Sequence, residues 1–185
     1  MKKKGLALLL ALTLVVVGVA SGTLAWLTAK TDTVVNTFTT SGIEVELTET
    51  TGADYKMIPG YTIAKDPKAT VKAGSEDCFL FVKLEKSANF DQYLEYTMAD
   101  GWTELTGVEG VTGVYYRQVT NVTADATFEV LKDSKVTVKG GVTSEMMDAA
   151  ETSKPTLKVT AYASQLYKSA GFEFTAAEAW ANVNA

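Results

Sequence analysis

The sequence contains no histidine and a single cysteine, Cys78, among its 185 residues. Without histidine it cannot form a His-Glu-x-x-His zinc site or a Ser-His-Asp or Cys-His catalytic set, and it lacks the commonest general base at neutral pH. One cysteine cannot make an intrachain disulfide, so the stability of the fold must come from its core. The composition gives no reason to expect a cofactor or an enzyme.

Basic residues are also few, with 17 lysines and arginines against 22 acidic residues and a net charge of −5. Binding to phosphate backbones needs a basic face, so nucleic acid is not an expected partner. The same balance gives no reason to expect attraction to anionic lipid.

Charge is absent from a long stretch near the amino terminus. Lys2, Lys3 and Lys4 precede residues 5–29, which carry no charged side chain. A basic start, an apolar run and then small residues are typical of a secretory signal. The Thr-x-Ala pattern that ends at Ala25 predicts cleavage between Ala25 and Trp26, in preference to the earlier Gly-x-Ala pattern that ends at residue 20.

An uncleaved membrane anchor is the alternative for this stretch, with the lysines on the cytoplasmic side. Either reading exports the rest of the chain, and only the uncleaved segment would contact a membrane. Removal of residues 1–25, which hold three lysines and no acidic residue, leaves 160 residues with 14 basic and 22 acidic side chains, a net charge of −8. That length suits one domain with its own core.

Three short patterns carry a more specific signal than the composition does. They are SGTLAWLT at residues 21–28 with NTFT at 36–39 and SGIEVEL at 41–47; PG at 59–60 with KDP at 65–67, Val71 and GS at 74–75; and VTAYA at 159–163 with Gln165. Together they resemble the TasA and camelysin family of exported proteins of Gram-positive bacteria. The resemblance spans most of the chain in short pieces, and the piece around the signal is the most specific.

The resemblance implies processing by a dedicated signal peptidase of the SipW type and assembly into extracellular matrix fibres. In TasA-like proteins, an amino-terminal strand is donated to the sheet of the next subunit. The expected donor here is residues 26–38, in which Val34, Asn36 and Phe38 point to one side. Camelysin has been described as a metallopeptidase. A zinc site without histidine would need carboxylates and carbonyls, which suit calcium better, so no metal site is expected.

Alternation of apolar and polar residues predicts many short strands. Residues 33–47 are expected to form a long, bent strand region in which Ile43, Val45 and Leu47 face a core. Residues 78–85 form the strongest interior strand, with Cys78 as a buried apolar side chain. The other expected strands are 61–65, 69–72, 93–98, 102–105, 114–120, 126–131, 136–139 and 156–163.

Turn and cap signals complete this prediction. Asp100-Gly101 predicts a hairpin that joins strands 93–98 and 102–105. Asp66-Pro67 argues against a central position for segment 61–72, because proline donates no ladder hydrogen bond. Short helices are expected at 144–150 and at 176–183, the second opened by a capping box of Thr175 and Glu178.

Other candidate sites have simpler explanations. The carboxylate pairs Glu76 with Asp77, Asp100 with Glu104, and Glu145 with Asp148 lack the spacing of a calcium loop, and we interpret them as solvated surface. The aromatic residues Trp102, Tyr115, Tyr116 and Trp180 are more typical of a sandwich core than of a ligand groove.

The sequence therefore predicts an all-β fold, an antiparallel sandwich or jelly roll with one or two short helices, in a single domain over residues 26–185. The expected function is that of a secreted or cell-surface structural protein that associates with itself into fibres. A membrane-anchored surface domain that binds a ligand remains the alternative, ahead of a camelysin-like peptidase.

Overall fold

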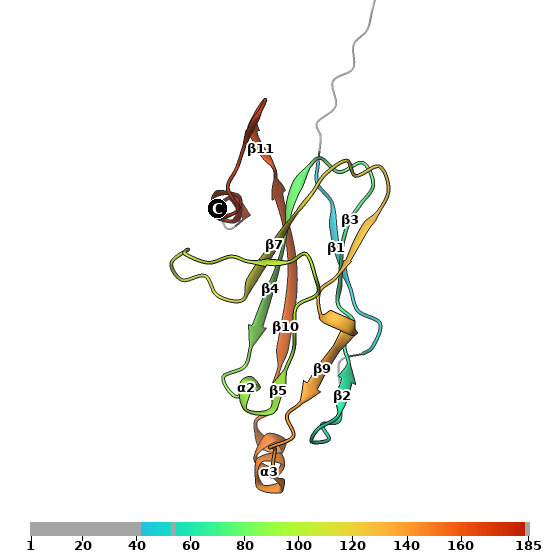
Figure 1. The fold of residues 1–185 in the computed structure, drawn as a ribbon, viewed down its shortest axis with the longest axis vertical. Coiled ribbons are helices and arrows are strands. Elements are labelled where there is room, and N and C mark those ends of the chain that lie inside the picture. The colour runs from blue at the N-terminus through green and yellow to red at the C-terminus, as the bar shows by residue number, and fades with distance from the viewer. Residues whose placement is uncertain (1–41, 53–54, 184–185) are drawn as a thin grey trace, which may run out of the picture. The chain divides into compact units, whose positions relative to one another are not determined.

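Four antiparallel sheets make up the computed structural model, which describes residues 42–52 and 55–183 (Figure 1). The largest sheet has the order β10 (Leu157–Gln165), β4 (Cys78–Lys86), β7 (Val114–Val119) and β6 (Thr103–Glu104). A second has the order β1 (Val45–Thr48), β3 (Lys68–Val71) and β8 (Ala126–Glu129). A third has the order β2 (Thr62–Ala64), β9 (Lys135–Val138) and β5 (Leu94–Glu95).

The remaining elements are short. β11 (Tyr167–Ser169) and β12 (Phe172–Glu173) form a hairpin. The helices are α2 (Phe90–Tyr93), α3 (Ser144–Thr152), α4 (Ala176–Val183) and a 3₁₀ turn at Lys132–Ser134. Within the described ranges no helix is long and apolar enough to cross a membrane. All described residues belong to one unit over residues 40–185, and its sandwich-like all-β fold confirms the predicted fold class.

The main core lies between the four-stranded sheet and the two three-stranded sheets. Alternation along β4 turns Leu80, Val82 and Leu84 toward this core, where each is at most 4% exposed. β3 contributes Ala69 and Val71 from the opposite layer, both fully buried. Each of the two layers thus presents one apolar face to the other, as the period of two in a strand requires.

A second, smaller core covers the outer face of the four-stranded sheet. Phe79 and Phe81 point to this face, and α4 places Trp180 on Phe81 with ring centroids 5.3 Å apart. The capping box predicted for α4 is present, because the Thr175 N–H donates to the Glu178 carboxylate at 2.8 Å and the Glu178 N–H donates to Thr175 Oγ1 at 3.3 Å. The chain's own helix therefore supplies the cover that these phenylalanines need.

The predicted hairpin around Asp100-Gly101 is wrong. β5 pairs with β9, and β6 pairs with β7, so the two flanking segments belong to different sheets. Gly101 does make a turn, with a φ of +87°. The guanidinium of Arg117 packs against this glycine. A turn signal describes the local backbone, and packing of the flanking segments determines their partners.

The prediction for segment 61–72 is wrong for its second half, because β3 is the central strand of its sheet, whereas β2 is an edge strand and Asp66-Pro67 lies between the two strands. Pro67 immediately precedes β3, where its missing N–H costs nothing. Its carbonyl accepts a hydrogen bond from Val130 N at 3.0 Å. Of the long strand predicted over 33–47, residues 33–41 lie outside the described chain, and β1 begins at Val45.

Candidate functional site

β10 is the longest edge strand of the described sheets. It is nine residues long and pairs along its whole length with β4, which is its only hydrogen-bonded neighbour in the sheet. An edge strand presents a row of unpaired N–H and C=O groups on its other side. Natural edges are blunted by charged side chains, yet Lys158 is the one charged residue in β10. This edge is therefore a long and weakly protected template for another strand.

β1 is the edge of the facing sheet and lies close to β10. Some of their Cα atoms are within 8 Å of each other, but no backbone hydrogen bond joins these two strands. Directly hydrogen-bonded strands lie about 4.8 Å apart. No backbone hydrogen bond between β1 and β10 thus links the two layers of the sandwich along this side.

The apolar side chains along this side are only half-buried. They are Ile43, Val45 and Leu47 from the β1 segment and Leu157, Val159 and Ala161 from β10, and we call this set the open seam. All six pack against the main core, whose inner residues on the neighbouring strands are almost fully buried. Among the described residues, no strand lies between β1 and β10 to cover them. A strand laid along the β10 edge would bury them.

The opposite side of the sandwich is closed by hydrogen bonds from the segment around residues 97–102. Trp102 Nε1 donates to Glu129 O at 2.8 Å, and Ala99 N donates to Val130 O at 3.0 Å. Met98 and Leu131 form an antiparallel bridge. The contrast between the two sides makes the open seam a specific feature of the fold.

Arg117 fills the closed side from β7. Its guanidinium carbon lies 3.8 Å from the ring centroid of Phe128 and 5.4 Å from that of Trp102. Burial lowers the pKa of Arg117 from its ordinary value. A cation between two aromatic faces is favourable when it is desolvated, so this residue serves as a packed structural element.

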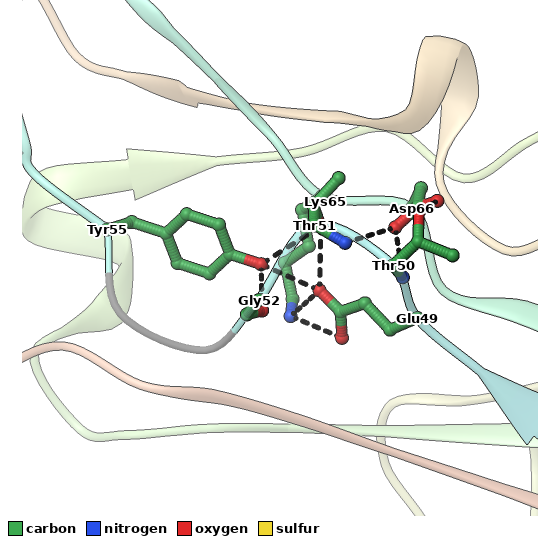
Figure 2. A network of polar contacts seen from close by, with 7 residues as sticks. All are labelled: Glu49, Thr50, Thr51, Gly52, Tyr55, Lys65 and Asp66. Atoms are coloured by element: carbon green, nitrogen blue, oxygen red, sulfur yellow. Dashed lines mark hydrogen bonds and ion pairs between the residues drawn. The ribbon is translucent and has the colours of Figure 1, made fainter.

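A polar network anchors the end of β1 opposite Ile43 (Figure 2). The Asp66 carboxylate accepts from Thr50 N at 2.9 Å, from Thr50 Oγ1 at 2.6 Å and from Thr51 N at 3.1 Å. Lys65 Nζ pairs with Glu49 at 2.8 Å, and Tyr55 Oη donates to the same carboxylate at 2.8 Å. The network joins the chain after β1 to the turn before β3, and it fixes β1 on its partner.

Hydrogen bonding holds the pKa of the Asp66 carboxyl well below its usual value, with the hydroxyl and backbone of Thr50 as the strongest causes. Burial raises the pKa of Tyr55. Neither group is adjusted toward proton transfer near neutral pH. The network in Figure 2 is therefore structural.

The predicted site residues Ala25, Trp26, Val34, Asn36 and Phe38 all lie outside the described residues. The three carboxylate pairs lie within the described residues. In the ranges 42–52 and 55–183, no group of three or more Cys, Asp or Glu residues is placed to hold a metal ion. Asp77 accepts from Asn121 N at 2.8 Å, and Asp100 is 3.8 Å from Lys132.

The four aromatic candidates lie in the two cores and around one hollow. Tyr115 and Trp180 line a hollow of about 830 Å³ bounded by β4, residues 108–114 and α4. Tyr116 belongs to the outer core with Trp180, and Trp102 packs against the main core. Trp180 is only 6% exposed, whereas Tyr115 on the wall of the same hollow is half-buried.

Cys78 is fully buried at the start of β4, as predicted. Burial raises the pKa of its thiol to about 11. The thiolate is the reactive form of cysteine, so this residue behaves as an apolar side chain in the folded protein.

The sequence predicted a strand at 156–163 but did not identify β10 as an edge, because the neighbours of a strand are not encoded locally. Comparison with known proteins gave no match to a family model, to a curated protein or to a solved structure. The open seam and the sequence patterns are therefore the features that bear on function.

Proposed function

We propose that this chain is an exported structural subunit of the extracellular matrix or cell surface that assembles into fibres by strand donation. A SipW-type signal peptidase would remove residues 1–25 between Ala25 and Trp26. The new amino-terminal segment of one subunit would then pair with the sheet of the next. The resemblance to TasA and camelysin supports the export and processing steps.

The observation that carries the proposal is the free edge of β10 beside the open seam. Nine residues in β10 span roughly 30 Å at about 3.4 Å per residue. The expected donor, residues 26–38, is thirteen residues long and can follow that whole edge. Strand addition would satisfy the unpaired backbone groups of β10, and its alternate side chains would cover the seam.

The alternation of side chains in the expected donor, residues 26–38, suits a strand that buries one of its faces. Val34 and Phe38 alternate with Val35 and Thr37, so one face of the donated strand carries two apolar side chains separated by Asn36. Main-chain hydrogen bonds would supply affinity, and the apolar side chains would select the register. A contact between two different surfaces of identical subunits repeats from one subunit to the next, and it propagates into a fibre when its rotation does not close a ring.

The first test is intact mass and amino-terminal sequencing of the protein from culture supernatant, with electron microscopy of the same fraction. We expect a start at Trp26 and filaments. A retained Met1, recovery with membranes and no filaments would favour the anchored surface domain and contradict assembly. Caseinolysis that chelators abolish would instead favour a peptidase.

The second test deletes residues 26–38 from the processed chain. We expect a folded monomer with the circular dichroism spectrum of a β protein and no filaments. Adding back a synthetic peptide of residues 26–38 should protect amides in β10 from hydrogen exchange. Filament formation by the deleted chain would remove strand donation as the mechanism.

A further inference from the structure

Four large apolar side chains are well exposed within residues 42–52 and 55–183, and they fall into two pairs. Ile58 and Tyr61 are 52% and 66% exposed on the turn that contains Pro59-Gly60. Tyr167 and Phe172 are 41% and 70% exposed on the β11–β12 hairpin. We call these pairs the turn patch and the hairpin patch. Exposed apolar side chains that share one turn or one hairpin are candidates for a contact surface.

The β11–β12 hairpin and the turn before β2, which carry the two patches, lie at opposite ends of the β domain (Figure 1). The turn patch is attached to the end of β9, because Gly60 N donates to Val138 O at 3.0 Å and Val138 N donates to Tyr61 O at 2.9 Å. The hairpin patch follows Leu166, whose N–H donates to Asp77 O at 2.9 Å beside the start of β4. The long strands β4 and β10 separate the two ends.

The chain enters the domain at the hairpin end. Glu76 N donates to Gly42 O at 3.2 Å, and the adjacent Asp77 holds Leu166. The residues before Gly42 include the expected donor. A subunit that gives these residues to a neighbour thus has its connection to that neighbour at the end that carries the hairpin patch.

We infer that the hairpin patch of one subunit packs against the turn patch of the next copy of this chain. The inference rests on the proposed fibre assembly. Growth along one direction brings unlike ends of successive subunits together, and these ends carry the four large apolar side chains that are well exposed among the described residues. A second copy accounts for both patches at once, whereas a separate partner would have to explain each of them independently.

The size of the patches defines their role. Four half-exposed side chains bury roughly 400 Å² when they meet. That area is well below the roughly 1,200 Å² of a stable protein interface. The contact therefore sets the relative orientation of neighbouring subunits, and a donated strand supplies the rest of the affinity.

Cysteine crosslinking tests this contact. The full-length chain would carry Tyr61→Cys and Phe172→Cys together, and a short bismaleimide would be added to the processed, assembled protein. Cys78 is fully buried, so the two introduced thiols are the accessible ones. We expect a ladder of covalent dimers, trimers and longer species. A variant with Glu109→Cys in place of Tyr61→Cys, exposed on the loop before β7, is the matched control and should give no ladder.

Single variants test the direction of the contact. Tyr61→Cys alone and Phe172→Cys alone should each stay monomeric in denaturing gels, and an equimolar mixture assembled together should give dimers only. Dimers from either single variant would indicate a symmetric contact and overturn the inference.

The outcomes separate the inference from the proposed function. Filaments without a ladder overturn the end contact and leave strand donation in place. A ladder that persists after deletion of residues 26–38 supports the contact and contradicts donation. A preparation with neither filaments nor a ladder overturns both.

Discussion

Leu84 and Gly113 approach each other more closely than a side chain at position 113 permits. Leu84 N donates to Gly113 O at 2.8 Å, and the backbone oxygen of Leu84 occupies the place that a Cβ atom on Gly113 would need. Gly113 also has a φ of +67°, in the left-handed region. This contact continues the β4–β7 ladder by one residue and depends on glycine.

Replacement of Gly113 by alanine should therefore destabilise the domain by about 3 kcal/mol, since the left-handed backbone and the clash both contribute. Gly110→Ala is the matched control. Its φ is +72°, but no atom lies within 4 Å of the Cβ position, so only the backbone cost of about 1 kcal/mol is expected. Urea unfolding of the two variants measures the difference. Equal losses would show that the contact with Leu84 is unimportant.

Trp180→Ala should lower the free energy of unfolding by about 3 kcal/mol. The indole is 6% exposed and packs on Phe81 and Tyr162, with both pairs of ring centroids 5.3 Å apart. Its removal exposes the outer face of the four-stranded sheet. Asn182→Ala, on the exposed side of α4, is the control and should be neutral. A tryptophan variant as stable as its parent would contradict a stabilising role for α4.

Much of the architecture was predictable from alternation along single strands. Residues 78–85 carry the pattern of a strand with two apolar faces, and β4 is that strand, with a core on each side. The cap of α4 was predictable from Thr175 and Glu178 alone, because the capping box is a local contact. The sequence predicted the structure correctly where the interacting residues are near each other in the chain.

Strand order was not predictable in the same way. β5 is joined to β9 and β6 to β7 by contacts between distant residues, so Asp100-Gly101 gave a misleading hairpin signal. The edge position of β10 has the same origin. Its inward residues are apolar like those of an inner strand, and β10 differs from one only in having a single neighbour among the described strands.

Asp66→Asn should destabilise the protein at neutral pH and reduce the dependence of its stability on acid. The pKa of Asp66 is lowered in the folded state by hydrogen bonds from Thr50 and Thr51. A lowered pKa stabilises the fold above the unfolded-state value of about 3.9, and this contribution is lost as the pH falls toward the folded-state pKa.

Urea unfolding at several acidic pH values measures this effect for Asp66. Asp100→Asn is the control, because the Asp100 side chain is 95% exposed and its ion pair with Lys132 is long, at 3.8 Å. The wild type and Asp66→Asn should converge in stability as the pH falls below about 4. Parallel pH profiles for the two proteins would contradict the assignment.

Cys78 should resist thiol reagents in the native state and react when the protein unfolds. The side chain is fully buried, and burial raises its thiol pKa to about 11, so the thiolate is rare at neutral pH. Labelling followed by mass spectrometry across a urea series should track the loss of β structure. Rapid labelling without denaturant would show that the core opens locally around the start of β4.

Val159→Ser should impair assembly more than folding. Val159 lies on β10, half-buried in the open seam, so its replacement should cost the free subunit only about 1 kcal/mol. In a fibre the same position would be covered by a donated strand, and a buried hydroxyl without a partner adds a further penalty. A total loss of roughly 1.4 kcal/mol at the contact raises the concentration needed for assembly about tenfold.

Lys158→Ser is the neighbouring control for Val159. Lys158 is 73% exposed and 3.3 Å from Glu85, and an exposed ion pair of this kind contributes little to stability. Light scattering and sedimentation would give the assembly threshold of each variant, and urea unfolding would give its stability. If Val159→Ser assembled at the wild-type concentration, the acceptor surface would have to lie elsewhere than β10. If both variants raised the threshold equally, the effect would come from the charge on this edge rather than from the apolar seam. A raised threshold for Val159→Ser alone, with its fold intact, would place the incoming strand over the seam.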